Sequence, residues 1–214
     1  MEEKKKVPEL RFPGFEDDWE EKKLGDIVSI NPKVNNMPPE FIYIDLESVI
    51  SGILIQKNYI NLADAPSRAQ RVLSKGDILF QMVRPYQKNN YFFDLNDSKI
   101  KYVASTGYAQ IRTVMCSKFF YCLFHTTKFV NEVINKCTGT SYPAINSTDL
   151  GAIDIFQTII PEQTKIANFL SDIDLKIEKL TKKKELMVQY KKGMMQTLFS
   201  QEIRFKDENG NESV

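Results

Sequence analysis

The segment between residues 67 and 118 carries the most uneven charge in the chain. It holds nine basic and three acidic side chains, although the formal net charge of the whole protein is only +1. Residues 1–66 have the opposite bias, with eight basic and thirteen acidic side chains. Positive charge concentrated in this way suits a phosphate backbone. The alternative is a solvated basic face without a ligand, and charge alone does not separate the two.

Catalytic chemistry has little support in the sequence. His125 is the only histidine and sits among apolar residues, which is typical of a core histidine and disfavours a serine–histidine–acid device. There is no phosphate-binding loop and no dinucleotide fingerprint. The carboxylates at the amino end form a hydrophilic run without glycosidase-like spacing; they are Glu16, Asp17, Asp18, Glu20 and Glu21. We therefore expect a non-catalytic binding module without a cofactor, and an enzyme with a carboxylate site is the minor alternative.

The three cysteines are predicted to be buried free thiols. Cys116, Cys122 and Cys137 lie in or beside one apolar stretch and lack the spacing of metal ligands. The chain has no apolar run long enough to span a membrane, and its charged start does not resemble a signal peptide. These features predict a protein of the reducing cytoplasm, with no metal site and no membrane partner.

Short apolar runs dominate residues 41–112 and favour strands over helices. They are rich in β-branched and aromatic residues, and turn residues separate them. Ser51-Gly52, Lys75-Gly76-Asp77 and Ser105-Thr106-Gly107 are the expected turns. Residues 19–30 could open with a short helix, and residues 151–161 are predicted to form a last strand.

Two helices of different character follow the strands. Residues 117–139 carry a broad apolar face and predict one helix packed on the domain core. Residues 161–199 instead carry a narrow stripe at alternating steps of four and three, which predicts a long coiled-coil helix that needs a partner. The stripe comprises Ile166, Leu170, Ile173, Ile177, Leu180, Met187, Met194 and Leu198, interrupted by Lys184 and Lys191. The alternative is an ordinary helix packed on its own domain.

The expected fold class is therefore α/β of the α+β type, with a β-rich domain followed by one long helix. Helices do not alternate regularly with strands, so a doubly wound parallel sheet is not expected.

Three stretches resemble the specificity subunit of type I restriction–modification enzymes. They are PELRFPGFEDDWEEKKLGDIV, GDILFQMVRPY and the long run from Ser141 to Phe199. The most specific piece is Ile160-Pro161-Glu162-Gln163 with Ile166 and Leu170, together with the ending around Lys191-Lys192-Gly193.

The charged residues 1–10 are expected to be loose, and the resemblance implies a target recognition domain in residues 1–160. It further implies a conserved spacer helix in 161–200 and the start of a second repeat in 201–214. Such a subunit reads one half of a bipartite site in double-stranded DNA and is itself not catalytic. It brings methyltransferase subunits, and through them restriction subunits, to that site. The alternative function is a coiled-coil dimerising module that binds protein and not DNA.

Members of this family usually contain two recognition domains and two long helices, whereas this chain has one of each. Glu9-Leu10-Arg11-Phe12 is echoed by Glu202-Ile203-Arg204-Phe205. We therefore expect either a fragment cut at the start of a second repeat or a natural half-subunit. In both cases the helix is predicted to pair with a second copy or a second half-subunit. Lys184 and Lys191 would be solvent-facing ends of the stripe, register devices or contacts to a methyltransferase subunit.

Base reading requires side chains that reach base edges from loops. Arginine pairs with guanine, and Asn or Gln pairs with adenine, through two hydrogen bonds. The expected DNA-binding residues are Arg68, Gln70, Arg71, Arg84, Gln87, Lys88, Asn89 and Asn90, then Ser105, Thr106, Gly107, Thr138, Thr140, Ser141 and Tyr142. The family pattern assigns no base-contacting residue.

Overall fold

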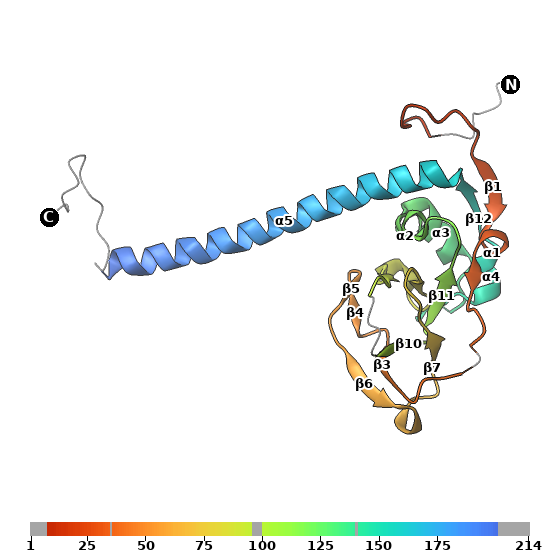
Figure 1. The fold of residues 1–214 in the computed structure, drawn as a ribbon, viewed down its shortest axis with the longest axis horizontal. Coiled ribbons are helices and arrows are strands. Elements are labelled where there is room, and N and C mark those ends of the chain that lie inside the picture. The colour runs from red at the N-terminus through yellow and green to blue at the C-terminus, as the bar shows by residue number, and fades with distance from the viewer. Residues whose placement is uncertain (1–7, 35, 96–99, 140, 201–214) are drawn as a thin grey trace. The chain divides into compact units, whose positions relative to one another are not determined.

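The computed structural model describes residues 8–34, 36–95, 100–139 and 141–200. The chain divides into two units, residues 1–167 and residues 168–214. The first unit is a mixed α/β domain rich in strands, and the second contains most of the long helix (Figure 1). The expected fold class is thus confirmed.

One four-stranded sheet has the order β6-β3-β10-β7. Its strands are β6 (Asn58–Asn61), β3 (Glu40–Ile44), β10 (Lys101–Ser105) and β7 (Ala69–Val72). Among the described strands of this sheet, only β3 and β10 pair in parallel. Because successive side chains point to opposite faces, Phe41 and Tyr43 enter one apolar cluster and Ile42 and Ile44 another. This burial on both faces explains the uninterrupted apolar run in β3.

The second four-stranded sheet has the order β2-β11-β8-β9. Its strands are β2 (Ser29–Ile30), β11 (Tyr108–Arg112), β8 (Ile78–Gln81) and β9 (Tyr91–Phe92). The expected break at Ser105–Gly107 is present, and there the chain leaves β10 of the first sheet and enters β11 of the second. Residues of both sheets, among them Ile44 and Leu79, share one buried cluster, so the two sheets are joined by a common core.

The helix predicted for residues 117–139 is two helices, α2 (Ser117–Leu123) and α3 (Thr127–Asn135). The single-helix prediction was wrong because Thr126 begins a new helix: its backbone is extended, and its side-chain oxygen caps the amide of Phe129. Phe120, Phe124 and Phe129 still enter one core, so the apolar face was identified correctly.

Two short elements near the ends of the domain also differ from expectation. Residues 20–23 form β1 (Glu20–Lys23), which pairs antiparallel with β12 (Asp154–Gln157), and only α1 (Leu24–Ile27) is helical in that region. Before β12, α4 (Ser147–Gly151) begins at an Asn146 cap that the pattern did not reveal. The remaining elements are β4 (Val49–Ile50), β5 (Ile53–Leu54) and the short 3₁₀ turns η1 (Leu62–Asp64) and η2 (Pro85–Gln87).

The long helix is confirmed as α5 (Ile160–Phe199), with 40 residues. At 1.5 Å per residue it is about 60 Å long. Its first turns belong to the β-rich domain, where Ala167 is fully buried and Ile166 packs against the core. Among the described residues, no helix combines the length and apolarity needed to cross a membrane.

Candidate nucleic-acid interface

Several connections meet at one end of the two sheets. Strand register aligns Ala104 with Ile44 and Ser105 with Ala69, and in the second sheet it aligns Tyr108 with Gln81. The exits of β3, β8 and β10 therefore lie at the same end as the entry to β7. Backbone bonds tie these connections together: Thr106 donates to the carbonyl of Arg68, and Met82 donates to the carbonyl of Gly107. We name this region the loop end.

The connection that leaves β8 has an unusual backbone. Arg84 and Lys88 flank η2 with φ values of 53° and 55°. Residues other than glycine rarely adopt this left-handed conformation, and surrounding structure must hold it in place. Such strain concentrates at functional sites, and in this loop it places two cationic residues on either side of one tight turn.

Gln81 fixes this connection through three hydrogen bonds. The sequence gives only one indication of this role, a polar residue within an apolar strand. The backbone amide of Gln81 donates to the Oδ1 atom of Asn90 at 2.9 Å, and its side-chain Oε1 accepts from the backbone amide of Asn89 at 3.1 Å. Its Nε2 donates to the Oε1 of Gln87 at 2.9 Å. Gln81 is only 3% exposed, and its bond to Asn90 is buried while the other two are partly buried; together the three bonds fix the loop.

The described residues of the predicted loop 138–142, namely 138–139 and 141–142, include neighbours of Arg84. The guanidinium carbon of Arg84 stands 4.2 Å from the ring centroid of Tyr142. The amide of Arg84 donates to the carbonyl of Pro143 at 2.8 Å, and Val83 and Thr138 both bridge to Ala144. Two segments far apart in the sequence are therefore joined, with a stacked cation at their junction.

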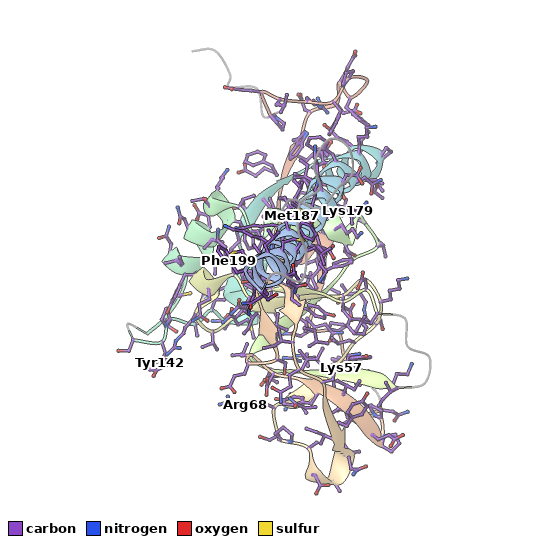
Figure 2. All side chains as sticks on the ribbon, turned by 90° about the vertical axis from the view of Figure 1, so that its left-hand side faces the viewer. Lys57, Arg68, Tyr142, Lys179, Met187 and Phe199 are labelled. Atoms are coloured by element: carbon purple, nitrogen blue, oxygen red, sulfur yellow. The ribbon has the colours of Figure 1, made fainter. Side chains whose placement is uncertain are left out.

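Three predicted residues precede or lie on β7, a strand where the sequence predicted a loop. Arg68 is exposed, and Gln70 is exposed with its side chain bonded to the carbonyl of Ser67 at 2.7 Å. Arg71 is half-buried, and burial lowers the pKa of its guanidinium. Its buried Nε has no hydrogen-bond partner among the described residues, so this donor is left unsatisfied by the domain itself. In Figure 2, the side chains of Arg68 and Tyr142 project outward from the domain.

Some predicted residues hold the loop end together and are unsuited to contact bases. Asn90 and Ser105 are 1% and 4% exposed, and both side chains accept hydrogen bonds from nearby amides. Lys88 is half-buried and its ammonium donates to the carbonyl of His125 at 3.0 Å. Gly107 packs so closely on Leu46 that an added Cβ would meet it at 3.0 Å. Thr140 lies outside the described residues.

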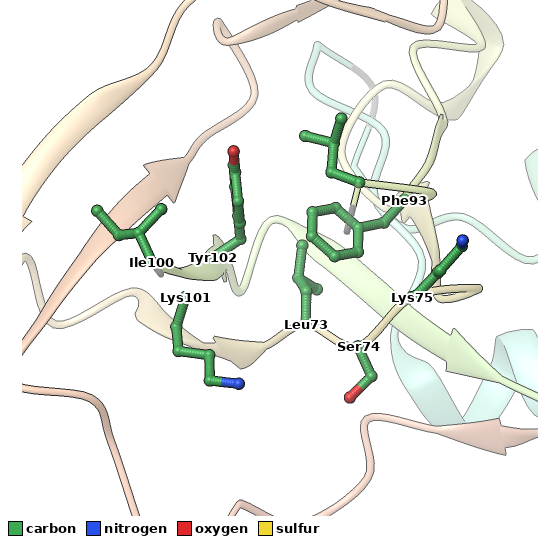
Figure 3. Close-up of a pocket in the computed structure, with 8 residues that line it drawn as sticks. Leu73, Ser74, Lys75, Phe93, Ile100, Lys101 and Tyr102 are labelled. Carbon is green, nitrogen blue, oxygen red and sulfur yellow. The ribbon is translucent and has the colours of Figure 1, made fainter. Parts of the chain in front are cut away.

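The basic residues do not gather on one face. Lys75 and Lys101 lie at the opposite end of the first sheet, beside a cavity of about 230 Å³ whose apolar wall includes Leu73, Phe93 and Tyr102 (Figure 3). Arg112 ends β11 and pairs with the buried Asp77 at 2.7 Å. The positive charge of residues 67–118 is thus divided between the two ends of the sheets, and of these basic residues Arg68, Arg71, Arg84 and Lys88 belong to the loop end.

Cysteine and histidine form no reactive cluster in the described part of the chain. Among the described residues, no group of three histidine, cysteine or acidic side chains could hold a metal ion. No disulfide joins the three cysteines in the described part of the chain, and each is half-buried, whereas buried thiols were predicted. His125 lies between α2 and α3, where its Nδ1 lies 2.7 Å from the carbonyl oxygen of Tyr121. It is a partly exposed structural residue, not the core histidine that was expected.

The start of α5 is a second polar cluster, where the sequence predicted only a helix start. Glu162 is fully buried and receives two hydrogen bonds from Arg11, at 2.7 and 2.8 Å, and a third from Thr158. Arg11 holds the pKa of the Glu162 carboxyl below its ordinary value. Gln163, also fully buried, bonds the amide of Cys116 and the carbonyl of Thr158. These residues anchor the helix start in the domain.

Beyond residue 167, α5 exposes large apolar side chains. Within the predicted stripe, Ile173, Ile177, Leu180 and Met187 are 40–57% exposed, and Leu170, Met194 and Leu198 are half-buried. Lys184 and Lys191 are exposed. Ile166 packs against the core of its own domain, so it does not belong to a free stripe. Figure 2 looks along this helix and labels Met187 and Phe199.

A β-rich domain with fixed polar loops and one long helix is the arrangement expected of a specificity subunit, and comparison with known proteins identifies the family. Residues 16–188 match the type I restriction modification DNA specificity domain. The chain therefore belongs to this family.

Two curated relatives are similar over most of the chain. One is the type I restriction enzyme HindI specificity subunit of Haemophilus influenzae, 26% identical over 190 residues, which cover 85% of this chain and 41% of the relative. The other is the MjaVIII specificity subunit of Methanocaldococcus jannaschii, 26% identical over 209 residues, covering 90% and 48%. The chain thus spans less than half the length of these relatives.

Solved structures show the same fold at lower identity. The HsdS subunit of Thermoanaerobacter tengcongensis matches with a TM-score of 0.66 and 24% identity, over 91% of this chain and 50% of that one. The type I restriction–modification S subunit of M. genitalium matches with a TM-score of 0.58 and 17% identity, over 91% and 49%.

Proposed function

We propose that this chain is a non-catalytic specificity module that reads one half of a bipartite DNA site through its loop end. The observation that carries the proposal is the convergence of exposed and partly exposed Arg, Gln and Asn side chains on loops that a partly buried hydrogen-bond network around Gln81 holds in place. Rigid placement matters because a bidentate contact to a base edge requires defined geometry. Arg84, Gln87 and Asn89 are the proposed base readers, with Arg68 and Gln70 beside them.

Other loop-end residues have supporting roles in this proposal. Thr106, Thr138, Ser141 and Tyr142 complete the surface, and Arg71 and Lys88 supply positive charge for phosphate groups. Asn90 and Ser105 are left out as contacts because their side chains are buried. The side chains of Gln87 and Asn89, although each accepts one hydrogen bond, are exposed or partly exposed.

Two copies, or two half-subunits, are proposed to pair through α5 and so space two reading domains. The exposed stripe of Ile173, Ile177, Leu180 and Met187 supports this, because apolar side chains at heptad spacing gain stability when they are covered by a second helix. The proposed dimer docks methyltransferase subunits and, through them, restriction subunits.

Sequencing of methylated sites tests the reading function. Cells that express the methyltransferase subunit should acquire a bipartite methylated motif only when this chain is also present. If the same motif appears without the chain, or none appears with it, the DNA-reading proposal fails.

Sedimentation tests the pairing separately. The unaltered chain should sediment as a dimer at tens of micromolar, and Ile177→Asp should shift it to a monomer because a carboxylate would be buried in the stripe. The matched control Glu178→Asp changes an exposed neighbour and should leave the dimer intact. A monomer for the unaltered chain would contradict the pairing.

A further inference from the structure

The β4–β5 hairpin is a two-stranded ribbon that belongs to neither main sheet. Val49 pairs with Leu54 and Ile50 pairs with Ile53, around a turn at Ser51-Gly52. Both turn residues have positive φ, 50° and 78°, as the tight hairpin turn with two left-handed residues requires. The ribbon is therefore a well-defined element, not an irregular loop.

The two faces of this ribbon differ sharply in burial. Val49 is fully buried, and Leu54 packs against the cluster shared by the sheets. On the other face, Ile50 and Ile53 are 53% and 65% exposed. The amide of Ile55 donates to the carbonyl of Ser48, so the row continues with Ile55 at 56% exposure. The outer face is a row of three isoleucines.

The ribbon stands at the loop end. It follows β3, whose last residue Ile44 lies opposite Ala104, and the intervening Leu46 contacts Gly107. At its tip, the amide of Ser51 donates to the Oδ1 of Asn89 at 3.0 Å. The tip is thus fixed against the loop that carries the proposed base readers (Figure 1 labels β4 and β5).

We infer that the β4–β5 ribbon enters the DNA major groove beside Asn89 and that Ile53, with Ile50, contacts thymine methyl groups. The major groove admits a two-stranded ribbon, and the thymine methyl is the apolar feature of its floor. The apolar side chains would lie next to the side-chain amides and the guanidinium group that are proposed to hydrogen-bond to bases. They would recognise base pairs at which no such hydrogen bond is made. This inference rests on the proposed function and assigns part of the reading to a segment that carries no basic residue between Val49 and Leu54.

Thymine-to-deoxyuridine substitution tests the contact, because it removes one methyl group and changes nothing else at the base edge. The assembled complex with methyltransferase subunits is titrated with duplexes of its own motif in which each thymine of the half-site is replaced in turn. At one or two positions the affinity of the unaltered complex should fall about fourfold, the effect of one buried methyl group.

Ile53→Ala and its control identify the residue responsible. The Ile53→Ala complex should bind thymine and deoxyuridine alike at one of those positions. Val114→Ala, which trims a 99% exposed residue beyond the opposite end of β11, should retain the discrimination. The inference is overturned if no position responds to deoxyuridine, or if Ile53→Ala discriminates as before.

The same experiment separates this inference from the proposed function. If the ribbon serves another partner, the motif and the affinity for it survive while methyl discrimination is absent. If the chain does not read DNA at all, there is no motif to titrate. A dimer that dissociates on Ile53→Asp would assign the ribbon to a contact between copies and would also overturn the inference.

Discussion

The domain contains two clusters built from the same polar residue types in opposite environments. At the start of α5, Arg11 pairs with the fully buried Glu162, and Gln163 is fully buried with its amide bonded to backbone and side chains. At the loop end, Arg84 stacks on the exposed ring of Tyr142, and Gln87 is exposed.

This difference shows which polar residues stabilise the fold and which are able to contact a ligand. A buried polar group must be satisfied within the protein, so its removal leaves a partner unpaired and lowers stability. An exposed or partly exposed group on a fixed loop contributes less to folding and keeps part of its hydrogen-bonding capacity for base edges. Variants of the two clusters should therefore lower different quantities.

The largest effect on stability is expected from Glu162→Ala. It leaves the guanidinium of Arg11, whose side chain is 15% exposed, without its carboxylate partner. The midpoint of urea unfolding should fall further than it does for Gln163→Ala or Arg84→Ala. The exposed-site control Glu178→Ala should unfold as the unaltered chain does, and equal midpoints for Glu162→Ala and Glu178→Ala would contradict the anchoring role.

Gln163→Ala should cost about 1–3 kcal/mol of unfolding free energy, because it leaves the Thr158 carbonyl and the Cys116 amide without partners. Urea unfolding followed by circular dichroism measures the loss. Gln196→Ala, at an exposed position of the same helix, serves as the control and should change stability by less than about 0.5 kcal/mol. Similar values for both variants would show that Gln163 does not anchor the helix.

Arg84→Ala should weaken DNA binding by about 1–3 kcal/mol and relax specificity at one base position. Its unfolding free energy should change by only about 1 kcal/mol or less, the size of the lost stacking on Tyr142. Lys75→Ala removes the same charge at the opposite end of the sheet and should leave specificity unchanged. Binding to matched and mismatched duplexes by the assembled complex measures both, and a uniform loss for Lys75→Ala as large as that for Arg84→Ala would contradict a localised reading surface.

Acid should narrow the stability difference between the unaltered chain and Glu162→Gln. The pKa of Glu162 is lowered from 4.5 in the folded state, mainly by the hydrogen bond from Arg11. Its stabilising contribution is therefore complete above that ordinary value and is lost as pH falls through the lower folded pKa. Unfolding free energies measured from pH 7 to pH 3 should converge, and a constant difference would show that the ion pair contributes nothing that depends on protonation.

Much of the architecture could be predicted from local pattern. The β-branched runs predicted β3, β8, β10 and β11, turn residues predicted the turn at Ser51-Gly52, and the heptad stripe predicted α5. The break between α2 and α3 was missed because the apolar face continues across it and only Thr126 reveals a new cap. β7 was missed because Arg68, Gln70 and Arg71 look like a polar loop, although pairing with β10 makes the last two part of a strand.

The site could be predicted only in outline, since residue type does not reveal burial. Asn89 and Asn90 are neighbours of the same type, yet Asn90 is buried and bonded to Gln81, whereas Asn89 reaches the ribbon tip. Arg11 and Glu162 are 151 residues apart, so no local pattern could join them. Which individual residues contact bases stays a prediction.

The most direct test of the reading surface is the methylated motif written in cells that contain the methyltransferase subunit and either the unaltered chain, Arg84→Ala or Lys75→Ala. We predict that Arg84→Ala relaxes the motif at one position of one half-site, while Lys75→Ala writes the unaltered motif. An unchanged motif with Arg84→Ala, or a motif altered by Lys75→Ala instead, would contradict the assignment of DNA reading to the loop end.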